Sequence, residues 1–582
     1  MNSTDDVSSI RWTQDDDGVV ILTMDDPTQR VNTANELFTR SFAAVLDRLE
    51  ASVDDVAGVV LTSAKSTFFA GGDLNRFLGI GPADRGRFLA DLRLRKSRTR
   101  RLEQLGRPVV ATIGGAALGG GLELALGCHH RIGVDDGRTL VGLPEVTLGL
   151  LPGAGGVVRT TRLLGLDKAL TELILEGRPV SARRARELGL LDDLVAAPAD
   201  LEARAKAWIL TAQTTSQPWD SPGFTAPGRR ASDGELLRSV QEALPRISLA
   251  RGSLDPTARV IFDLAVATAD TDIDTALDRE SEALADLVCG PVSKAKIRVV
   301  FFDTARLRSK ERRPTGAPAP GGRVVVTVAG DDGRAAADLL RASRHVSVLD
   351  LSGIDPAAAP TLLRMTLTPE DSLIWAAALD GRELTAEALD AVAGRVCVVL
   401  SPASGNTAPA GTVGVRLFPD LLAGTGAVAE LVVTGDDGVS DRGAAFDVLT
   451  RVGALPVLVH AGRGSFAARL HEALERETRA LVAEGVPLED VLTARRLAGF
   501  SGGTTPLDRA VGTTGTAEDI ARRLIQAVAA EAVARAESVL VHPDDVDVAS
   551  VRAGGFPAWT GGPDRCSANT RSAGTQTPAL SG

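Results

Sequence analysis

Three consecutive glycines, Gly119-Gly120-Gly121, stand directly before the segment LELAL and follow an apolar stretch at residues 108–114. The apolar stretch predicts a buried strand, and LELAL predicts a helix that begins near Gly120. Glycine permits close backbone approach, and the first amides of a helix have no partner within the helix. Those donors and the helix dipole favour negative charge. The run therefore predicts an oxyanion hole or, alternatively, a tight helix start packed on a strand.

Glu123 lies one turn inside this predicted helix, close to the same donors. A carboxyl group beside an apolar pocket has a raised pKa and can act in proton transfer. Its structural alternative is a carboxylate placed favourably near the helix dipole.

Three further segments follow the same order as those of a known family. They are FFAGGDL at residues 68–74, GLPEVTLGL at 142–150 and PGAGG at 152–156. Together with the glycine run, this set resembles the enoyl-CoA hydratase (crotonase) family over about residues 10–195. The resemblance implies a crotonase-type ββα spiral as the first part of an α/β chain.

The resemblance implies a role for individual residues. Ala70 and Gly120 match the two positions whose backbone amides form the oxyanion hole for a thioester carbonyl, and Glu123 and Glu145 match the two catalytic glutamates. Hydration of a 2-enoyl thioester needs a base for water at C3, an acid at C2 and donors for the enolate oxygen. We expect Glu123 to activate the water and Glu145 to exchange the C2 proton. A solvated loop carboxylate is the alternative for Glu145. Substrate contacts are expected at Gly71, Asp73, Gly121, Pro144 and Gly153.

A run of six basic residues in nine positions, Arg93 to Arg101, could attract the phosphates of a coenzyme A substrate. A solvated helix face is the more common explanation of such a run. The adjacent residues Cys128-His129-His130 are expected to be structural, because neighbouring side chains on a strand point to opposite faces and suit no single metal ion.

The net charge of −11 argues against a general nucleic-acid-binding protein. The four cysteines are scattered without a CxxC pair, which favours a reducing compartment over a disulfide framework or a zinc site. The acidic, polar start MNSTDDVSSI is not expected to be a signal peptide, and no apolar run is long enough to span a bilayer. We therefore expect a cytoplasmic protein with no metal.

The length of 582 residues calls for several domains. Strands are expected at 18–24, 56–62, 323–330, 346–351, 395–400, 429–434 and 455–460, and helices over 35–50, 181–210, 255–310 and 463–538. The expected domains are a crotonase core (1–195), a helical extension with a linking helix (196–310), a Pro- and Gly-rich linker (311–322), a degenerate Rossmann-like domain (323–462), a helical region (463–566) and a disordered tail (567–582).

The second half carries a further resemblance. Residues 280–310, 462–491 and GFPAWTGGP at 555–563 resemble parts of multifunctional fatty-acid β-oxidation enzymes, in which a hydratase is joined to a 3-hydroxyacyl-CoA dehydrogenase. The whole chain resembles a shortened member of that group.

The dinucleotide fingerprint of this half is degenerate. A G-x-G-x-x-G turn should follow the strand at 323–330, but Val328 replaces the first glycine and only Gly330 and Gly333 remain. The two aspartates between these glycines carry negative charge, which opposes the binding of a pyrophosphate. Asp350 stands where a ribose-binding acid is expected, so the binding of NAD stays doubtful.

The residues that would oxidise a hydroxyl group are also missing. Arg416 stands at the catalytic His, Pro506 at its partner Glu and Ala468 at an expected Asn, and no His lies between His345 and His460. Arginine does not act as a base at neutral pH because its pKa is too high.

These observations favour an enoyl-CoA hydratase with an inactive dehydrogenase-like half, which needs no cofactor for hydration. Three alternatives stay open: a bifunctional hydratase and NAD-dependent dehydrogenase, a non-catalytic acyl-CoA-binding or assembly subunit, and a double-bond isomerase. The expected partners are an acyl-CoA thioester and either a thiolase or further copies of the chain.

Overall fold

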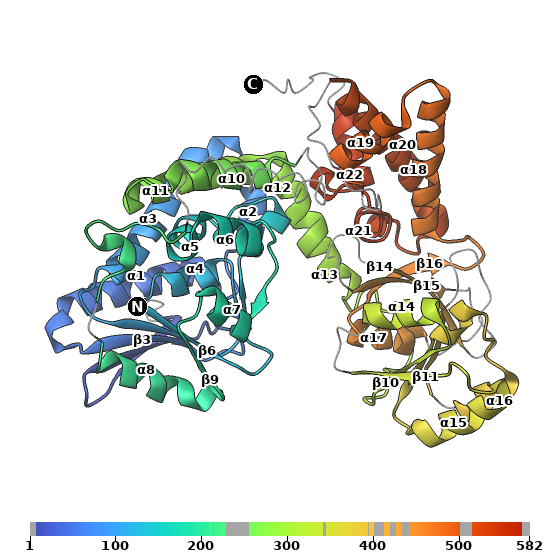
Figure 1. The fold of residues 1–582 in the computed structure, drawn as a ribbon, viewed down its shortest axis with the longest axis horizontal. Helices are drawn as coiled ribbons and strands as arrows, with labels where there is room; N and C mark the ends of the chain where they lie inside the picture. Colours follow the sequence, from blue (N-terminus) through green and yellow to red (C-terminus); the bar gives the residue numbers. More distant parts are fainter. Residues whose placement is uncertain are drawn as a thin grey trace, which may run out of the picture. The chain divides into compact units, whose positions relative to one another are not determined.

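The computed structural model describes residues 7–212, 215–228, 255–340, 345–393, 395–400, 412–419, 426–433, 442–500 and 515–572. The chain forms two compact units that divide between Ile297 and Arg298. Each unit is described separately (Figure 1).

A six-stranded sheet forms the centre of the first unit. Its order is β1 (Ile10–Gln14), β2 (Val19–Met24), β3 (Gly58–Ser63), β4 (Val109–Ile113), β6 (His130–Val134) and β9 (Asp193–Val195). Only β1 is antiparallel to its neighbour. The strands expected at 18–24, 56–62 and 108–114 are confirmed. The expectation of unbroken helix over 181–210 is wrong, because β9 separates α7 (Ala182–Leu188) from α8 (Leu201–Ile209) and joins the sheet edge.

A small second sheet contains β5 (Ala117–Leu118), β7 (Leu140–Gly142) and β8 (Val180–Ser181), and Phe69 joins β5 through a parallel bridge. The chain thus repeats one pattern: a strand of the large sheet, a short stretch of the small sheet, and then a helix. This repetition is the crotonase-type ββα spiral expected from the resemblance.

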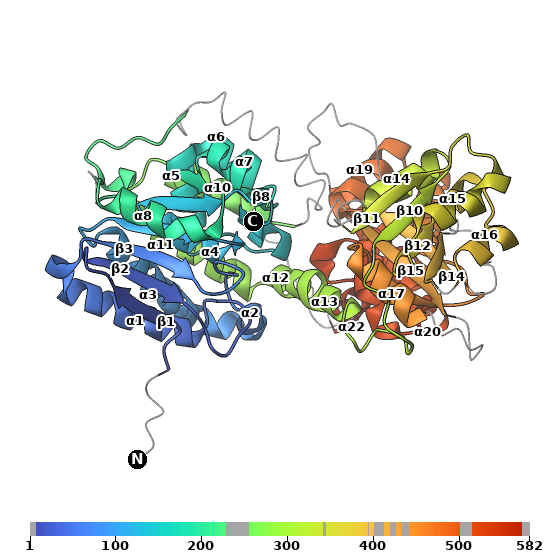
Figure 2. The same cartoon turned by 90° about the horizontal axis from the view of Figure 1, so that it is seen from below.

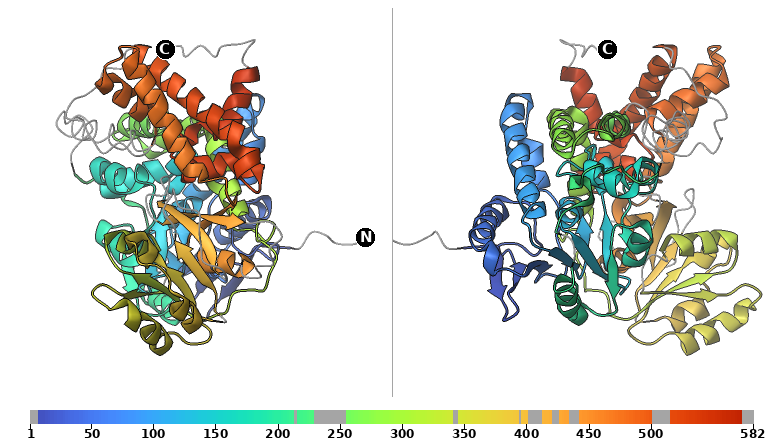
Figure 3. Two further views of the ribbon diagram at one scale, coloured as in Figure 1. Left: turned by 90° about the vertical axis from the view of Figure 1, so that its right-hand side faces the viewer. Right: turned by 60° about the vertical axis from the view of Figure 1, so that its left-hand side comes forward.

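Helices cover both faces of the large sheet, with α8 packed on one face through Leu201, Ala205 and Ile209 (Figure 3). The other helices of this unit are α1 (Glu36–Ala51), α2 (Leu74–Gly79), α3 (Arg85–Glu103), α4 (Gly120–Leu126), α5 (Gly156–Leu164), α6 (Leu166–Ala169), α10 (Thr257–Thr268), α11 (Ile273–Cys289) and α12 (Pro291–Lys296). The helix expected over 35–50 is confirmed as α1.

The boundary between the units lies within the expected linking helix rather than at the 311–322 segment. Helix α11 packs in the first unit, where a Cβ on Gly153 would stand 2.8 Å from Leu284 Cγ. The next segments, η7 (Ile297–Asp303) and α13 (Thr304–Leu307), place Val299 and Leu307 in the apolar core of the second unit. The two ends of this helical stretch therefore bury their apolar faces in different cores.

A seven-stranded sheet forms the centre of the second unit. Its order is β11 (Val346–Asp350), β10 (Val324–Val328), β12 (Ser372–Trp375), β13 (Cys397–Leu400), β14 (Val413–Pro419), β15 (Ala427–Val433) and β16 (Leu455–His460). All neighbours are parallel except β14 and β15. The sequence analysis missed β12 and β14. In chain order the sheet begins 2-1-3-4-5, so the order in which successive strands join the sheet reverses between β10 and β12, although the two strands are parallel.

Helices α14 (Asp331–Leu340) and α17 (Arg442–Arg451) pack on one face of this sheet, and α15 (Ala359–Thr366) and α16 (Ala386–Ala391) on the other (Figure 2). A helical region follows with α18 (Phe466–Ala483), α19 (Leu488–Ala498), α20 (Gly515–Val539), α21 (Val546–Arg552) and α22 (Pro563–Ser572). Helix α22 continues to Ser572, past the start of the disordered tail that we expected at Ser567. Among the described helices, none combines the length and the apolar character that a membrane span requires.

Candidate active site

Three predicted segments meet because they follow neighbouring stretches of the small sheet. Phe69 pairs with Ala117, and β5 pairs with β7 through Leu118 and Gly142, all in parallel. The residues that come next in each segment therefore lie side by side: Gly71-Gly72, Gly119-Gly120 and Pro144-Glu145. The Gly119 amide donates to the Gly142 carbonyl at 2.9 Å, which holds the second segment against the third.

Two backbone amides, those of Gly72 and Gly120, lie close together between the first two segments. A Cβ on Gly120 would lie 3.4 Å from Gly71 Cα and 3.8 Å from the Gly72 nitrogen. Neither the Gly72 nor the Gly120 amide has an acceptor among the residues that the structure describes, and Gly72 is exposed. The Gly120 amide opens helix α4, where no partner within the helix exists.

The predicted oxyanion donor Ala70 is wrong. Its amide donates to the Asn32 carbonyl at 2.8 Å, so it is not available to a ligand. Asn32 is itself buried and donates through Nδ2 to Ser63 Oγ at 2.9 Å. The available amide of this segment belongs to Gly72, two residues later, and the sequence contained no signal for this choice.

Glu123 is 3% exposed and points at the start of helix α5. Its Oε1 accepts hydrogen bonds from the Ala154 amide at 2.6 Å and the Gly156 amide at 2.7 Å. These two amides favour the charged carboxylate. The PGAGG segment therefore serves to hold Glu123 in place.

Glu145 is the second residue of the short helix η3 (Pro144–Leu148), and its carboxyl group lies against Gly119. A Cβ on Gly119 would collide with Oε1 and stand 3.3 Å from Cδ. Oε2 is buried and has no hydrogen-bond partner among the described residues. Glu145 is thus no solvated loop carboxylate, and its environment favours the neutral acid.

The two glutamates influence one another electrostatically. Burial, followed by the charge of Glu280, raises the pKa of Glu123 to about 7, although the Ala154 and Gly156 amides oppose that rise. Burial, followed by the charge of Glu123, raises the pKa of Glu145 well above its usual value. The site therefore combines the carboxylate of Glu123, which accepts two amide hydrogen bonds, with the carboxyl group of Glu145, whose Oε2 has no partner among the described residues. This difference suits a base and an acid at neutral pH.

The predicted substrate contacts have different local roles. Gly71 has a φ of +90° and lies against Gly120, and Asp73 caps α2 by accepting from the Asn75 and Arg76 amides. Gly121 and Gly153 are buried. A Cβ on Gly121 would collide with the Phe69 carbonyl oxygen and one on Gly153 with Leu284. Pro144 starts η3 directly before Glu145. Gly121 and Gly153 thus allow close packing around the site.

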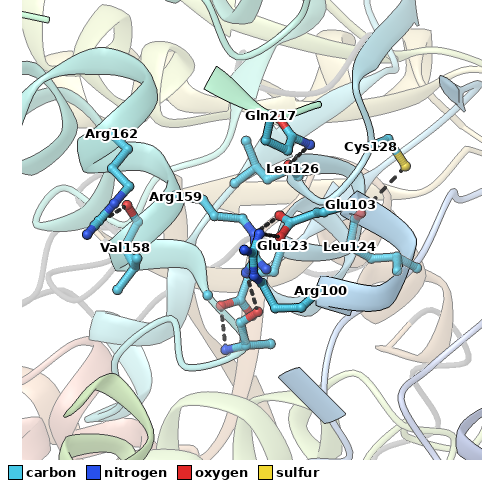
Figure 4. A network of polar contacts seen from close by, with 12 residues as sticks. Arg100, Glu103, Glu123, Leu124, Leu126, Cys128, Val158, Arg159, Arg162 and Gln217 are labelled. Carbon is cyan, nitrogen blue, oxygen red and sulfur yellow. Dashed lines mark hydrogen bonds and ion pairs between the residues drawn. The ribbon is translucent and has the colours of Figure 1, made fainter. Parts of the chain in front are cut away.

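Behind Glu123 lies a buried ionic network that the sequence analysis missed (Figure 4). Arg159 is fully buried and donates to Glu103 Oε1 at 2.5 Å, and Arg100 donates to Glu103 Oε2 at 2.6 Å. Arg100 also pairs with Asp220 at 2.6 Å and with Asp274 of α11 at 3.0 Å. The network joins α3, α5 and α11 around the end of the Glu123 side chain.

The basic run from Arg93 to Arg101 is engaged within the first unit. Arg93 pairs with Asp278, Lys96 pairs with Glu280 at 2.8 Å, and Arg101 pairs with Asp47 and Glu50. These side chains bind the carboxylates of their neighbours.

In the second unit, the place expected for a pyrophosphate is taken by a side chain. Asp380, at the end of η9 (Ala376–Asp380) after β12, accepts from the Asp332 and Gly333 amides at 3.1 Å each. These amides belong to the first turn of helix α14. A Cβ atom added to Gly330 or to Gly333 would stand 2.5 Å from an oxygen of the Asp380 carboxylate. The donors that a dinucleotide phosphate needs are thus held by a carboxylate of the same chain.

Asp350, the residue expected to bind a ribose, also accepts hydrogen bonds from its own chain. Asp350 accepts from Arg334 at 3.1 Å and from the Ser352 amide at 2.8 Å. Hydrogen bonds from Ser352, followed by that from Arg334, lower the pKa of Asp350 to about 2.

Arg416 lies in β14, is 1% exposed and donates to the Gly464 carbonyl at 3.1 Å and to Glu430 at 3.4 Å. Glu430 also accepts from Ser465 Oγ at 3.1 Å, and Ser465 caps α18 at the Ala468 amide. Arg416, at the position expected for a catalytic His, therefore forms a buried ion pair. Ala468, at the position expected for an Asn, donates its amide to the Ser465 cap of α18. Pro506 lies outside the described residues.

Comparisons with known proteins agree with the geometry of the first unit. Residues 14–218 match the family described as enoyl-CoA hydratase/isomerase. The fatty acid oxidation complex subunit alpha of Shewanella amazonensis is 34% identical over 340 residues, covering 58% of this chain and 47% of that protein. The protein of the same name from Idiomarina loihiensis is 33% identical over 297 residues, covering 51% and 41%. The chain spans about half the length of the curated relatives it matches.

Among solved structures, the enoyl-CoA hydratase of Bacillus anthracis is 26% identical, with a TM-score of 0.32 over 47% of this chain and 89% of that one. The structure of Pseudomonas aeruginosa DspI is 28% identical, with a TM-score of 0.32 over 37% and 84%. The motifs, the spiral of strands and the family match all fall on the same residues, so the segment 14–218 of this chain is similar to the enoyl-CoA hydratase/isomerase family.

Proposed function

We propose that the first unit adds water to trans-2-enoyl-CoA thioesters to give 3-hydroxyacyl-CoA. The observation that carries the proposal is the placement of two carboxyl groups, those of the buried Glu123 and the half-buried Glu145, beside two available backbone amides, Gly72 and Gly120. The family match over residues 14–218 supports the same chemistry.

The proposed reaction uses each group once. Glu123, as carboxylate, takes a proton from a water molecule while the water oxygen forms a bond to C3. The electron pair of the double bond moves to the thioester oxygen, and the Gly72 and Gly120 amides stabilise this enolate. Each such donor is typically worth about 3–4 kcal/mol in the transition state. Glu145, as neutral acid, then gives its proton to C2. No cofactor is needed for this addition, because no electrons are exchanged.

Glutamine substitutions test the assignment. Glu145→Gln and Glu123→Gln should each lower the hydration rate of crotonyl-CoA, followed by loss of the enoyl absorbance, by about 10²–10⁴-fold. Glu187→Gln is the matched control, because Glu187 is 56% exposed on α7. Unchanged turnover in the Glu145 variant would refute the site, and conversion of a 3-enoyl thioester without hydration would favour an isomerase.

We also propose that the second unit does not oxidise 3-hydroxyacyl-CoA with NAD. The capping of α14 by Asp380 and the ion pair of Arg416 with Glu430 support this. Formation of NADH from 3-hydroxybutyryl-CoA by the full chain, followed by the absorbance of the reduced nicotinamide, would establish the bifunctional alternative instead.

The partner and the compartment are proposed on separate grounds. The matched relatives are named as subunits of a complex, and we propose a thiolase as the partner of this chain. Co-purification with a thiolase but no hydratase rate would favour a pure assembly subunit. None of the four cysteines, all of which lie among the described residues, forms a disulfide, and we propose a reducing, cytoplasmic location for this chain.

A further inference from the structure

Helix α11 places one carboxylate, Glu280, beside the candidate hydration site. Glu280 lies 157 residues after Glu123 in the sequence and is fully buried. Its Oε1 accepts from the Gly155 amide at 2.7 Å, and its Oε2 accepts from the Val158 amide at 3.0 Å. Two of the first amides of α5 are therefore bound by α11 rather than by α4.

Glu123 and Glu280 share the start of helix α5 in an alternating way. Glu123 accepts from Ala154 and Gly156, and Glu280 accepts from Gly155 and Val158. Two carboxylates at one helix start repel each other, and the dipole of α5 offsets only part of this repulsion. A nearby cation is needed to hold both.

Lys96 supplies that cation. Its Nζ lies 2.8 Å from Glu280 Oε1 and donates to the Leu277 carbonyl at 2.6 Å, and its side chain is only 5% exposed. Lys96 is thus a buried amine on α3 that faces the carboxylates at the start of α5. Burial lowers its pKa, and the charge and hydrogen bond of Glu280 oppose this effect and favour the ammonium form. Neither Glu280 nor Lys96 has a role in the reaction proposed above.

We propose that Glu280 and Lys96 are positioning residues of the hydration site. Glu280 accepts two of the four amide hydrogen bonds that carboxylates accept at the start of α5, and the other two amides bind Glu123. The opposite charges of Glu280 and Lys96 set the electrostatic potential at the Glu123 carboxylate. The inference rests on the proposed function, because it acts through Glu123 as the base. It makes helix α11 a part of the site.

Other charged groups also face this position. Glu145 approaches from η3 and interacts with both Glu123 and Glu280, and Arg159 of α5 interacts with Lys96. Glu103 and Arg100 of α3 are bound to Arg159 and to one another. These groups remain unchanged in the variants below, so the variants isolate the Glu280–Lys96 pair.

The test is the acidic limb of the pH profile of kcat/KM for crotonyl-CoA hydration, measured with the full chain. Removing the negative charge in Glu280→Gln makes the Glu123 carboxylate easier to form, so the limb should move to lower pH by about one unit. Removing the positive charge in Lys96→Met should move it to higher pH by a similar amount. Lys96→Arg should restore the wild-type limb.

Glu282→Gln is the control on the same helix, because Glu282 is 50% exposed and should leave the limb in place. A purely structural pair would lower kcat in both variants without moving the limb in opposite directions, and that result would overturn the inference. If Glu280→Gln does not fold, as judged by circular dichroism, Lys96→Met carries the test alone. Loss of folding in both would identify the pair as structural and overturn the inference. Absence of hydration in the wild-type chain would instead overturn the proposed function.

Discussion

The carboxyl group of Glu145 stands directly against Gly119, so that a Cβ on this glycine would collide with Oε1 and come within 3.3 Å of Cδ. Gly119 has a φ of +53° and precedes the first residue of α4. One glycine thus permits both the turn that exposes the Gly120 amide and the approach of the predicted acid.

Gly119→Ala should therefore impair both stability and hydration. The positive φ costs an alanine about 1–3 kcal/mol, and the new methyl group displaces Glu145. We expect a lower melting temperature and a loss of crotonyl-CoA hydration larger than the loss of folded protein. Gly137→Ala is the control, because Gly137 also has a positive φ of +70° but a Cβ added to it would meet nothing within 4 Å. Equal effects of the two changes on the rate would contradict the role of Gly119.

The raised pKa values of the two glutamates predict a pH-dependent stability. Burial and the neighbouring charges raise the folded pKa of Glu123 to about 7 and also raise that of Glu145, whereas an unfolded glutamate titrates near about 4.3. The folded chain therefore binds more protons, and this contribution to stability is full below the unfolded value and is lost as the pH rises through the folded values.

A glutamine at position 145 does not ionise, so the variant does not lose this contribution to stability as the pH rises. The melting temperature of Glu145→Gln, relative to wild type, should rise between pH 5 and pH 8, by about 2–4 °C for each kcal/mol. Glu187→Gln should show a constant difference. A difference for Glu145→Gln that stays flat or falls with pH would show that Glu145 is not held in a neutral state.

Gly153→Ala tests the packing of α11 beside the site. The new methyl group would lie 2.8 Å from Leu284 Cγ and 2.9 Å from Leu284 Cβ, and such overpacking typically costs about 1–3 kcal/mol. The thermal stability should fall and should recover in part in the double variant with Leu284→Ala. Gly86→Ala, in α3 with nothing within 4 Å, should be neutral or stabilising. Additive losses in the double variant would argue against this contact.

Asp380→Ala tests the capping of α14 in the second unit. Loss of the two hydrogen bonds to the Asp332 and Gly333 amides should destabilise this unit by about 1 kcal/mol. The measurement is urea unfolding followed by circular dichroism. Asp331→Ala should have a smaller effect, because its side chain is fully exposed. A stabilised Asp380→Ala variant would show that this carboxylate is repelled by Asp331 and Asp332 rather than bound by the helix start.

Much of the local structure followed from patterns along the chain. Apolar runs with turn residues at their ends predicted β2, β3 and β4, and the glycine run predicted the start of α4. These predictions depend on neighbouring residues only. The sequence analysis did not predict short strands such as β9 and β12. Three or four residues show too little strand periodicity to be distinguished from the helical patterns on either side.

The order of motifs in the sequence indicated the resemblance of residues 10–195 to the enoyl-CoA hydratase family and the candidate pair Glu123 and Glu145. Only the tertiary structure decided that the Ala70 amide is bound by Asn32, that Glu280 and Lys96 stand behind Glu123, and that Asp380 takes the start of α14. The physical reason is that these contacts join residues from separate elements. Which donor remains available, and which charge is neutralised, depends on the packing of helix faces and strand ends that no local pattern records.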